Sequence, residues 1–330
     1  MKKLVLAFVF LITAQLVFGS STPMPLFDYL EQDKPLEVII KTDFSAIIDN
    51  KLTSKSYQPG IFSFEGKDGK KREIPLKVKA RGKFRRQNCD FPPLKLKFKK
   101  TDLALMGLDT FNTFKLVTHC SGDELTGESY LKKEFLAYQM MNQFMDMSFR
   151  TQLLKIKYID SNGNKSTLKT YAFLIEDDEQ LANRMNGKVV KSFNTSPERV
   201  DKVQLTKIAL FNYLIGNSDW NLRMSKNLKF IKQQNGQLCP IAYDFDFSSF
   251  VNPPYIKHGE YILKEIYLSP SELIDIKSEV LDKKEDFFQI IKEFQYASAT
   301  EKRKMRKCIE IGFEKLEAIT FSDKNGASAK

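Results

Sequence analysis

The chain has 330 residues, of which 42% are hydrophobic and 12% aromatic, a composition typical of globular rather than disordered proteins. Its 52 Lys and Arg residues exceed its 41 Asp and Glu residues, so the formal net charge is +11. The basic residues are interleaved with acids, and local clusters occur only at 67–100 and 302–307. This pattern indicates a solvated basic surface and disfavours a nucleic-acid partner. The two histidines, His119 and His258, exclude a histidine-rich metal site.

Residues 1–19 have the pattern of a secretory signal peptide: a lysine pair, an apolar run, and small or neutral residues before Ser20. A membrane anchor is the alternative, but the apolar run is short for a spanning helix. No later stretch of the sequence could span a membrane. We therefore expect a mature chain that is secreted, periplasmic or otherwise extracytoplasmic and has no transmembrane segment.

Alternating polar and apolar residues predict several strands early in the chain. Segments 36–41, 61–65 and 73–80 alternate in this way, and an Asp-Gly turn lies at 67–71 between the last two. The spacing predicts a β-rich N-terminal region.

A further strand, at 94–99, has one basic face, because its Leu and Phe residues alternate strictly with Lys95, Lys97 and Lys99. A lysine row of this kind is common on the edge strand of a sheet, where it protects against aggregation. The alternative is that one lysine binds the phosphates of a nucleotide. For that role Lys97 is the first choice and Lys95 the alternative.

The next segments predict a strand at 110–118, an amphipathic helix at 130–144, and a hairpin with strands at 153–158 and 168–175. Glu134 lies on the helix. It is a candidate partner for a phosphate-binding lysine, although a charged residue on a helix is usually solvated.

The central stretch begins with residues 203–215, whose apolar side chains recur at helical spacing and predict a buried helix. Gly216 and Asn217 end this helix. Asp219 then lies in a polar loop.

Two strands follow this loop, at 228–231 and 237–250, and a turn joins them. Asn227 directly precedes the first strand, and Asp244 and Asp246 lie at the end of the second. A hairpin would therefore bring Asn227 close to Asp244.

Phosphoryl transfer requires mainly positioning and charge: one carboxylate to orient the attacking hydroxyl, and oxygen ligands that hold Mg²⁺ on the phosphates. Asp219 is the candidate for the first role. Asn227, Asp244 and Asp246 are the candidate metal ligands, because Mg²⁺ needs only one or two carboxylates and keeps several waters. The alternative is ordinary turn chemistry, in which Asn, Asp, Ser and Gly are the common residues.

The ordered motif resembles the catalytic core of the spore-coat-protein-H (CotH) family of atypical, protein-kinase-like proteins. That family has a GN-x-DW loop, an Asn before a strand, and a DxD that ends the next hairpin. The matching residues are Gly216, Asn217, Asp219, Trp220, Asn227, Asp244 and Asp246.

The resemblance implies an α+β, two-lobed protein-kinase-like fold. Its β-rich N-terminal lobe would span 20–180, and its mainly helical C-terminal lobe, with the metal-binding hairpin, would span 181–320. Residues 321–330 would form a loose tail. The resemblance also implies Asp219 as the catalytic residue, and ATP with Mg²⁺ or Mn²⁺ as cofactors.

Outside the core motif, the resemblance adds Arg81 and Gly82, followed by a polar loop, a proline and the Lys95–Lys97 strand. Because the chain has no GxGxxG loop, Arg81 and the basic turn after it are the candidates for covering the phosphates. Glu176 matches a glutamate at the family's hinge, whose backbone would meet the adenine. Without the resemblance, the acids at 176–179 are simply favourable charges at a helix N-terminus.

The four cysteines, Cys89, Cys120, Cys239 and Cys308, lack the spacing of a zinc site and allow three disulfide pairings. Among these pairings, the resemblance favours Cys89 with Cys120.

Helices are predicted at the C-terminal end of the chain, the first with Ser269 as its N-cap and Glu272 completing a capping box. Others are predicted at 284–296 and 300–319. The favoured function is an exported atypical kinase that transfers phosphate from Mg-ATP to a hydroxyl acceptor, with a protein as the expected acceptor. The first alternative is a non-catalytic binding or structural protein of the cell surface or periplasm, and the second is a polyanion binder.

Overall fold

The computed structural model describes residues 22–330 apart from 121–123, 193, 255–259, 322–326 and 330. The predicted signal peptide lies outside these residues. None of the helices in the described part of the chain combines the length and apolar character that a membrane span needs.

Seven strands close into a barrel in the order β1-β2-β3-β4-β5-β7-β6. All neighbouring pairs are antiparallel except β1 and β6, which pair in parallel and close the barrel. The strands are β1 (Leu36–Thr42), β2 (Gln58–Glu65), β3 (Lys71–Ala80), β4 (Leu94–Phe98), β5 (Thr113–Val117), β6 (Thr151–Asp160) and β7 (Leu168–Ile175).

The apolar side chains of the alternating segments fill the barrel, because side chains two residues apart point to the same side of a strand. In β1 buried and exposed residues alternate along the whole strand. Phe62, Phe98 and Phe114 lie inside the barrel, and the Phe98 ring contacts each of the other two edge to face. Short helices occur in the N-terminal segment and the connections: α1 (Leu26–Leu30), α2 (Phe44–Asp49), α3 (Lys83–Asn88) and α4 (Lys100–Leu105).

The expected two-lobed protein-kinase-like fold, with a β-rich N-terminal lobe and a mainly helical C-terminal lobe, is wrong. The β-rich part is a closed seven-stranded barrel accompanied by helices. The closing contact joins β1 to β6, with Leu36 opposite Leu154, and local alternation carries no signal for such a distant parallel pair.

The barrel also overturns the edge-strand interpretation of the lysines in β4. Strand β4 pairs with β3 on one side and with β5 on the other. It is therefore an inner strand.

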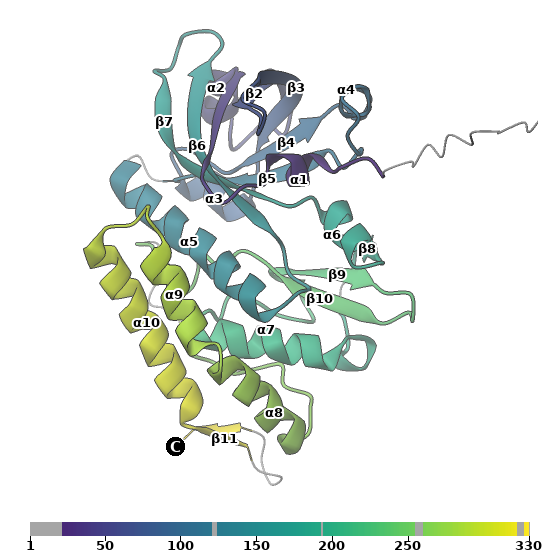
Figure 1. Ribbon diagram of the computed structural model, residues 1–330, viewed down its shortest axis with the longest axis vertical. Helices are drawn as coiled ribbons and strands as arrows, with labels where there is room; N and C mark the ends of the chain where they lie inside the picture. The colour runs from purple at the N-terminus through teal and green to yellow at the C-terminus, as the bar shows by residue number, and fades with distance from the viewer. Residues whose placement is uncertain (1–21, 121–123, 193, 255–259, 322–326, 330) are drawn as a thin grey trace, which may run out of the picture.

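Helices α5, α7, α8, α9 and α10 lie below the barrel, and α5 is next to the barrel, as Figure 1 shows. Helix α5 contacts β7 and α9, and α7 contacts α8, α10 and β10. A three-stranded sheet lies beside α7 in the order β10-β9-β8. These elements are α5 (Glu124–Phe144), α6 (Asp178–Arg184), β8 (Lys188–Val190), the 3-10 helix η1 (Pro197–Arg199), α7 (Lys202–Leu214), β9 (Leu228–Lys232), β10 (Leu238–Ala242), α8 (Pro270–Leu281), α9 (Lys284–Glu293), α10 (Ala299–Glu317), β11 (Ile319–Phe321) and β12 (Ala327–Ala329).

Several helix predictions are confirmed. Helix α7 matches the predicted helix at 203–215, and α8 begins with the predicted capping box of Ser269 and Glu272. In contrast, β8 lies in a region that has no clear periodicity and was not predicted, whereas α6 begins at the acids that the sequence places at a helix N-terminus.

Candidate functional site

The loop after α7 has a fixed shape that depends on Gly216. This residue has φ of 63°, and a Cβ atom there would lie 2.6 Å from the Ser249 Oγ, so a larger residue would be strained and crowded. The Asn217 side chain donates to Asn212 Oδ1 (2.8 Å) and accepts from the Asp219 N–H (3.1 Å). The buried Asn217 thus sets the position of Asp219.

Asp219 is held by the residues that precede β9. The Asn227 side-chain amide donates to the Asp219 backbone carbonyl (2.7 Å) and to its Oδ2 (3.0 Å). The Lys226 ammonium forms an ion pair with Asp219 Oδ1. The Asp219 side chain remains 23% exposed, so it is accessible from solvent.

The β9–β10 hairpin brings Asn227 close to Asp244, as predicted. Leu228 lies opposite Ala242, and the Tyr243 N–H donates to the Asn227 carbonyl (3.1 Å). However, β10 ends at Ala242 and does not extend to residue 250 as predicted. The chain leaves the strand because Asp244 has φ of 68°, in the left-handed region that L residues rarely adopt.

Asp244 belongs to a cluster of three carboxylates around Arg85 of α3. The guanidinium donates to Asp246 Oδ2 (2.9 Å), Glu134 Oε2 (2.8 Å) and Asp244 Oδ1 (3.1 Å). The Asp244 N–H also donates to the Tyr138 hydroxyl of α5 (2.9 Å). Arg85 and Tyr138 together fix Asp244 between the barrel side and α5.

Burial raises the pKa of Asp246 well above its ordinary value and also raises the pKa of Glu134, although Arg85 opposes both shifts. Asp246 was predicted as a metal ligand. Its carboxylate instead accepts from Arg85 in a buried site, so binding a metal there would require Arg85 to move. Glu134 was considered as a partner for a lysine, and its partner is Arg85.

A buried lysine, Lys115 of β5, is the site residue that sequence reasoning missed. Its side chain is 14% exposed and forms an ion pair with Asp178, whose other oxygen binds Lys229 (3.0 Å). Burial lowers the pKa of Lys115 to about 8. The ammonium lies 5.4 Å from the centroid of the Tyr243 ring, and Tyr243 directly precedes Asp244. A single charged residue in the strand TFKLV was the available signal.

Of the predicted phosphate-binding lysines, one neighbours Lys115 and the other does not. Lys95 is directly opposite Lys115, whereas Lys97 is exposed and opposite Thr113. Burial raises the pKa of Tyr243, and the positive charges of Lys229 and Arg81 oppose this shift. Within the described residues, the Arg81 guanidinium has no ion-pair partner.

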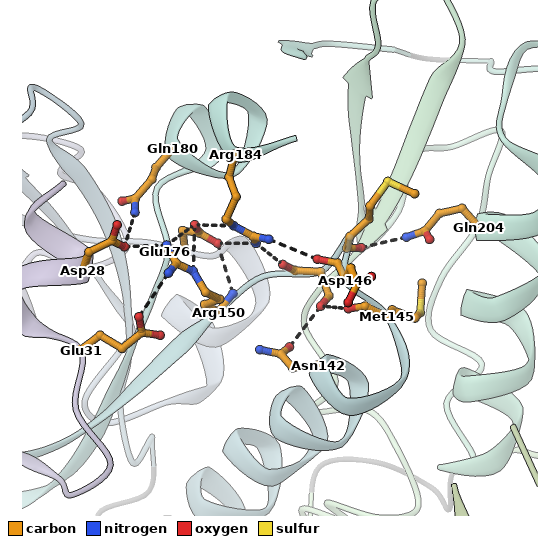
Figure 2. Close-up of polar contacts among 12 residues, drawn as sticks. Asp28, Glu31, Asn142, Met145, Asp146, Arg150, Glu176, Gln180, Arg184 and Gln204 are labelled. Carbon is orange, nitrogen blue, oxygen red and sulfur yellow. Dashed lines mark hydrogen bonds and ion pairs between the residues drawn. The ribbon is translucent and has the colours of Figure 1, made fainter. Parts of the chain in front are cut away.

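The Glu176 side chain holds two arginines in place (Figure 2). Its buried carboxylate accepts from Arg150 Nη2 (2.8 Å) and Arg184 Nη2 (3.0 Å). Arg150 also pairs with Asp28 and Glu31. The Glu176 N–H donates to the Arg150 carbonyl (3.0 Å), so it is not available to an adenine base.

The disulfide between Cys89 and Cys120 confirms the favoured pairing, with an S–S distance of 2.05 Å. Cys89 is the C-cap of α3, so the bond ties the helix that carries Arg85 to the segment after β5. Cys239 and Cys308 are free thiols.

One cavity adjoins the cluster around Arg85, and another adjoins Arg150. A cavity of about 130 Å³ is lined by Arg85, Glu134 and Asp246, and has room for a few waters rather than a nucleotide. A larger cavity of about 1010 Å³ lies between α5, β6 and α9 and touches Arg150, away from Asp219 and Asp244.

Asn227 and Asp244 carry an amide and a carboxylate oxygen, the ligand types that Mg²⁺ prefers. Within the described residues, no group of three or more His, Cys, Asp or Glu side chains is arranged around a metal position. Mg²⁺ does not need such a group, because phosphate oxygens and waters can complete its shell. The side-chain Oδ1 of Asn227 and the Oδ2 of Asp244 are the oxygens that could bind the cation, because the Asn227 backbone carbonyl accepts from the Tyr243 N–H and Asp244 Oδ1 accepts from Arg85.

Comparisons with known proteins give little sequence support. The sequence matches no protein-family model and no curated relative. The resemblance to the CotH family therefore remains a prediction. Among solved structures, the chain is similar to the Helicobacter pylori proinflammatory kinase CtkA, with a TM-score of 0.42 and 12% identity. The match covers 68% of this chain and 91% of that one.

Proposed function

We propose that the chain is an exported phosphotransferase of the CotH type that transfers the γ-phosphoryl group of Mg-ATP to a hydroxyl group, with a protein as the acceptor. The observation that carries this proposal is the convergence of Asp219, Asn227 and Asp244. Asn227 bonds to Asp219 directly, and its backbone bonds to the residue before Asp244.

Each residue of the site has a role that its surroundings support. Asn227 and Asp244 would hold Mg²⁺, which neutralises phosphate charge when bound. Lys115 and Arg81 would bind phosphate oxygens. Asp219, fixed by Asn217 and Asn227, would orient the acceptor hydroxyl.

The reaction balances without a further reactant. The acceptor oxygen forms a bond to the γ-phosphorus as the bond from that phosphorus to the β–γ bridging oxygen breaks. ADP leaves with the electron pair of the broken bond. The hydroxyl proton passes to Asp219 and then to solvent.

A specific observation favours the non-catalytic alternative. The carboxylates of Asp219, Asp244 and Asp246 all have cationic partners, Lys226 for the first and Arg85 for the other two. A binding protein could keep this arrangement as a purely structural network.

The test is transfer of labelled γ-phosphate by the mature chain, with Asp219→Asn, Asp244→Asn and the control Asp275→Asn on the exposed face of α8. Loss of a positioned carboxylate typically lowers the rate by about 10²-fold or more. We expect such losses for Asp219→Asn and Asp244→Asn, and wild-type transfer by Asp275→Asn. Equal transfer by all four proteins would refute the assignment. No transfer by any of them, with Mg-ATP bound, would support the binding protein.

A further inference from the structure

Three lysines lie side by side on the outward face of the barrel. Lys79 of β3 is directly opposite Lys95 of β4, and Lys95 is directly opposite Lys115 of β5. Directly opposite residues point to the same face, with Cβ atoms roughly 5 Å apart. We call these three residues the lysine row.

Like charges at opposite positions destabilise a sheet. Burial and the neighbouring charge of Lys79 both lower the pKa of Lys95, in keeping with the directly opposite positions of the two residues. Of the lysine row, only Lys115 has an ion-pair partner within the described residues. Protection of an edge does not explain the arrangement, because β4 is an inner strand.

Another part of the barrel provides a contrast. Lys157 of β6 and Lys169 of β7 are also directly opposite each other. There, the nearby Lys155 faces Glu37 of β1, and the groove over these strands is also lined by Glu65, Glu73 and Glu128. Basic and acidic side chains are mixed on that face. Among the described residues, the carboxylate that pairs with the lysine row is Asp178, at the Lys115 end.

The aromatic rings beside the lysine row are already covered. The Lys79 ammonium lies over the Tyr57 ring (4.4 Å), and the Lys115 ammonium lies over the Phe149 ring (4.7 Å) and close to Tyr243 (5.4 Å). A nucleobase stacks on exposed ring faces. These rings are therefore poor partners for a base, whereas the ammonium groups suit phosphates.

We propose that the triphosphate of the donor nucleotide lies along the lysine row, so that the phosphates rather than the base provide most of the affinity. This inference rests on the proposed function and deepens it, because it names what the site recognises in its donor. Neighbouring strands are about 4.8 Å apart, so the row extends for about 10 Å, a length that a chain of three phosphates can follow. One end of the row, at Lys115, is beside Tyr243 and hence next to Asp244.

The experiment measures binding of ATP to the mature chain in the presence of Mg²⁺ and competition by inorganic tripolyphosphate, adenosine and polyglutamate. The variant is Lys79→Gln with Lys95→Gln. The matched control is Lys157→Gln with Lys169→Gln, which removes the other pair of opposed lysines. Thermal melts establish that both double variants are folded.

We expect tripolyphosphate to displace ATP with a Kd within about tenfold of that of ATP, and adenosine not to displace it. Loss of two charges facing phosphates should weaken ATP and tripolyphosphate by at least about tenfold, with no change in the control. Displacement by adenosine but not tripolyphosphate would overturn the proposal, as would unchanged affinity in the variant. Polyglutamate that binds the lysine row and is not displaced by ATP would also overturn it, because the occupant would then be an acidic protein.

The result is separable from the proposed function. Phosphate binding along the lysine row without phosphoryl transfer would leave this inference intact and refute the enzyme. Transfer with an unchanged KM for ATP in Lys79→Gln, Lys95→Gln would do the reverse.

Discussion

Arg85 is the residue whose replacement tests the structure most directly. Its side chain is 10% exposed and binds three carboxylates, of which Glu134 is 4% and Asp246 is 5% exposed. Replacing Arg85 with Met keeps most of the volume but leaves these two carboxylates unpaired in a buried site. Removing one partner of a buried ion pair costs about 3–5 kcal/mol. For a chain of 330 residues, the expected fall in Tm is about 4–7 °C.

The pH dependence separates lost charge pairing from lost packing. Burial raises the pKa of Glu134 and of Asp246 in the folded state, and Arg85→Met removes the charge that opposes this shift. A carboxyl with a raised folded pKa contributes stability that is fully present below its unfolded pKa and is lost as pH rises through the folded pKa. The Tm deficit of Arg85→Met should therefore be small at about pH 4 and large at about pH 8.

The assay is a set of thermal melts of wild type and Arg85→Met across this pH range, with Arg303→Met of the exposed part of α10 as the control. A second variant, Arg85→Met with Glu134→Gln and Asp246→Asn, should recover stability at about pH 8, because neutral amides replace the unpaired carboxylates. A deficit that is the same at all pH values would refute the electrostatic argument. It would show that Arg85 contributes only by packing.

Two further predictions concern the barrel side of the site. Because the pKa of Lys115 is lowered to about 8, the free protein loses this charge as pH rises through that value. The affinity for ATP should therefore fall over the same range, and Lys115→Met should bind weakly with no such dependence, as measured by titration calorimetry. Replacing Cys89 and Cys120 by Ser should cost about 2–5 kcal/mol, and a melt with and without reductant should show the shift for the wild type but not for the variant. An unchanged Tm on reduction would contradict the proposed tether of α3.

One half of the site, formed by Asn217, Asp219, Asn227 and Asp244, could be predicted because these residues are close in sequence. We call it the polar half. Asn217, Asp219 and Asn227 lie in one loop, and a single hairpin brings Asp244 to them, so turn chemistry and strand length were enough. The left-handed conformation of Asp244 was not predictable, since aspartate is only an occasional choice there. As a result, the predicted strand at 237–250 was too long.

The other half, formed by Arg85, Lys115 and their carboxylate partners, could not be predicted because its residues come from separate elements of the chain. We call it the cationic half. Arg85 lies 49 residues from Glu134 and 161 residues from Asp246. Lys115 meets Asp178 only because β5 pairs with β7 inside the barrel. Barrel closure is a long-range property, and local patterns gave the strands without their order. Lys95 and Lys97 were therefore recognised as one basic face of a strand, but the position of Lys95 opposite Lys115 was not recognised.

The two halves together place a carboxylate on one side and positive charge on the other, as a Mg-triphosphate requires. On the helical side, Arg85 binds Asp244 through Oδ1, and within the described residues Oδ2 accepts no hydrogen bond. Arg85 can therefore hold Asp244 in place while the other oxygen faces a cation. On the barrel side, Lys115 offers positive charge beyond Tyr243. A ligand with a divalent cation at one end and phosphates at the other satisfies both sides, whereas a simple anion would leave Asp244 facing negative charge. For this reason phosphate binding should be stronger with Mg²⁺ than without it, and Asp244→Asn should reduce that difference.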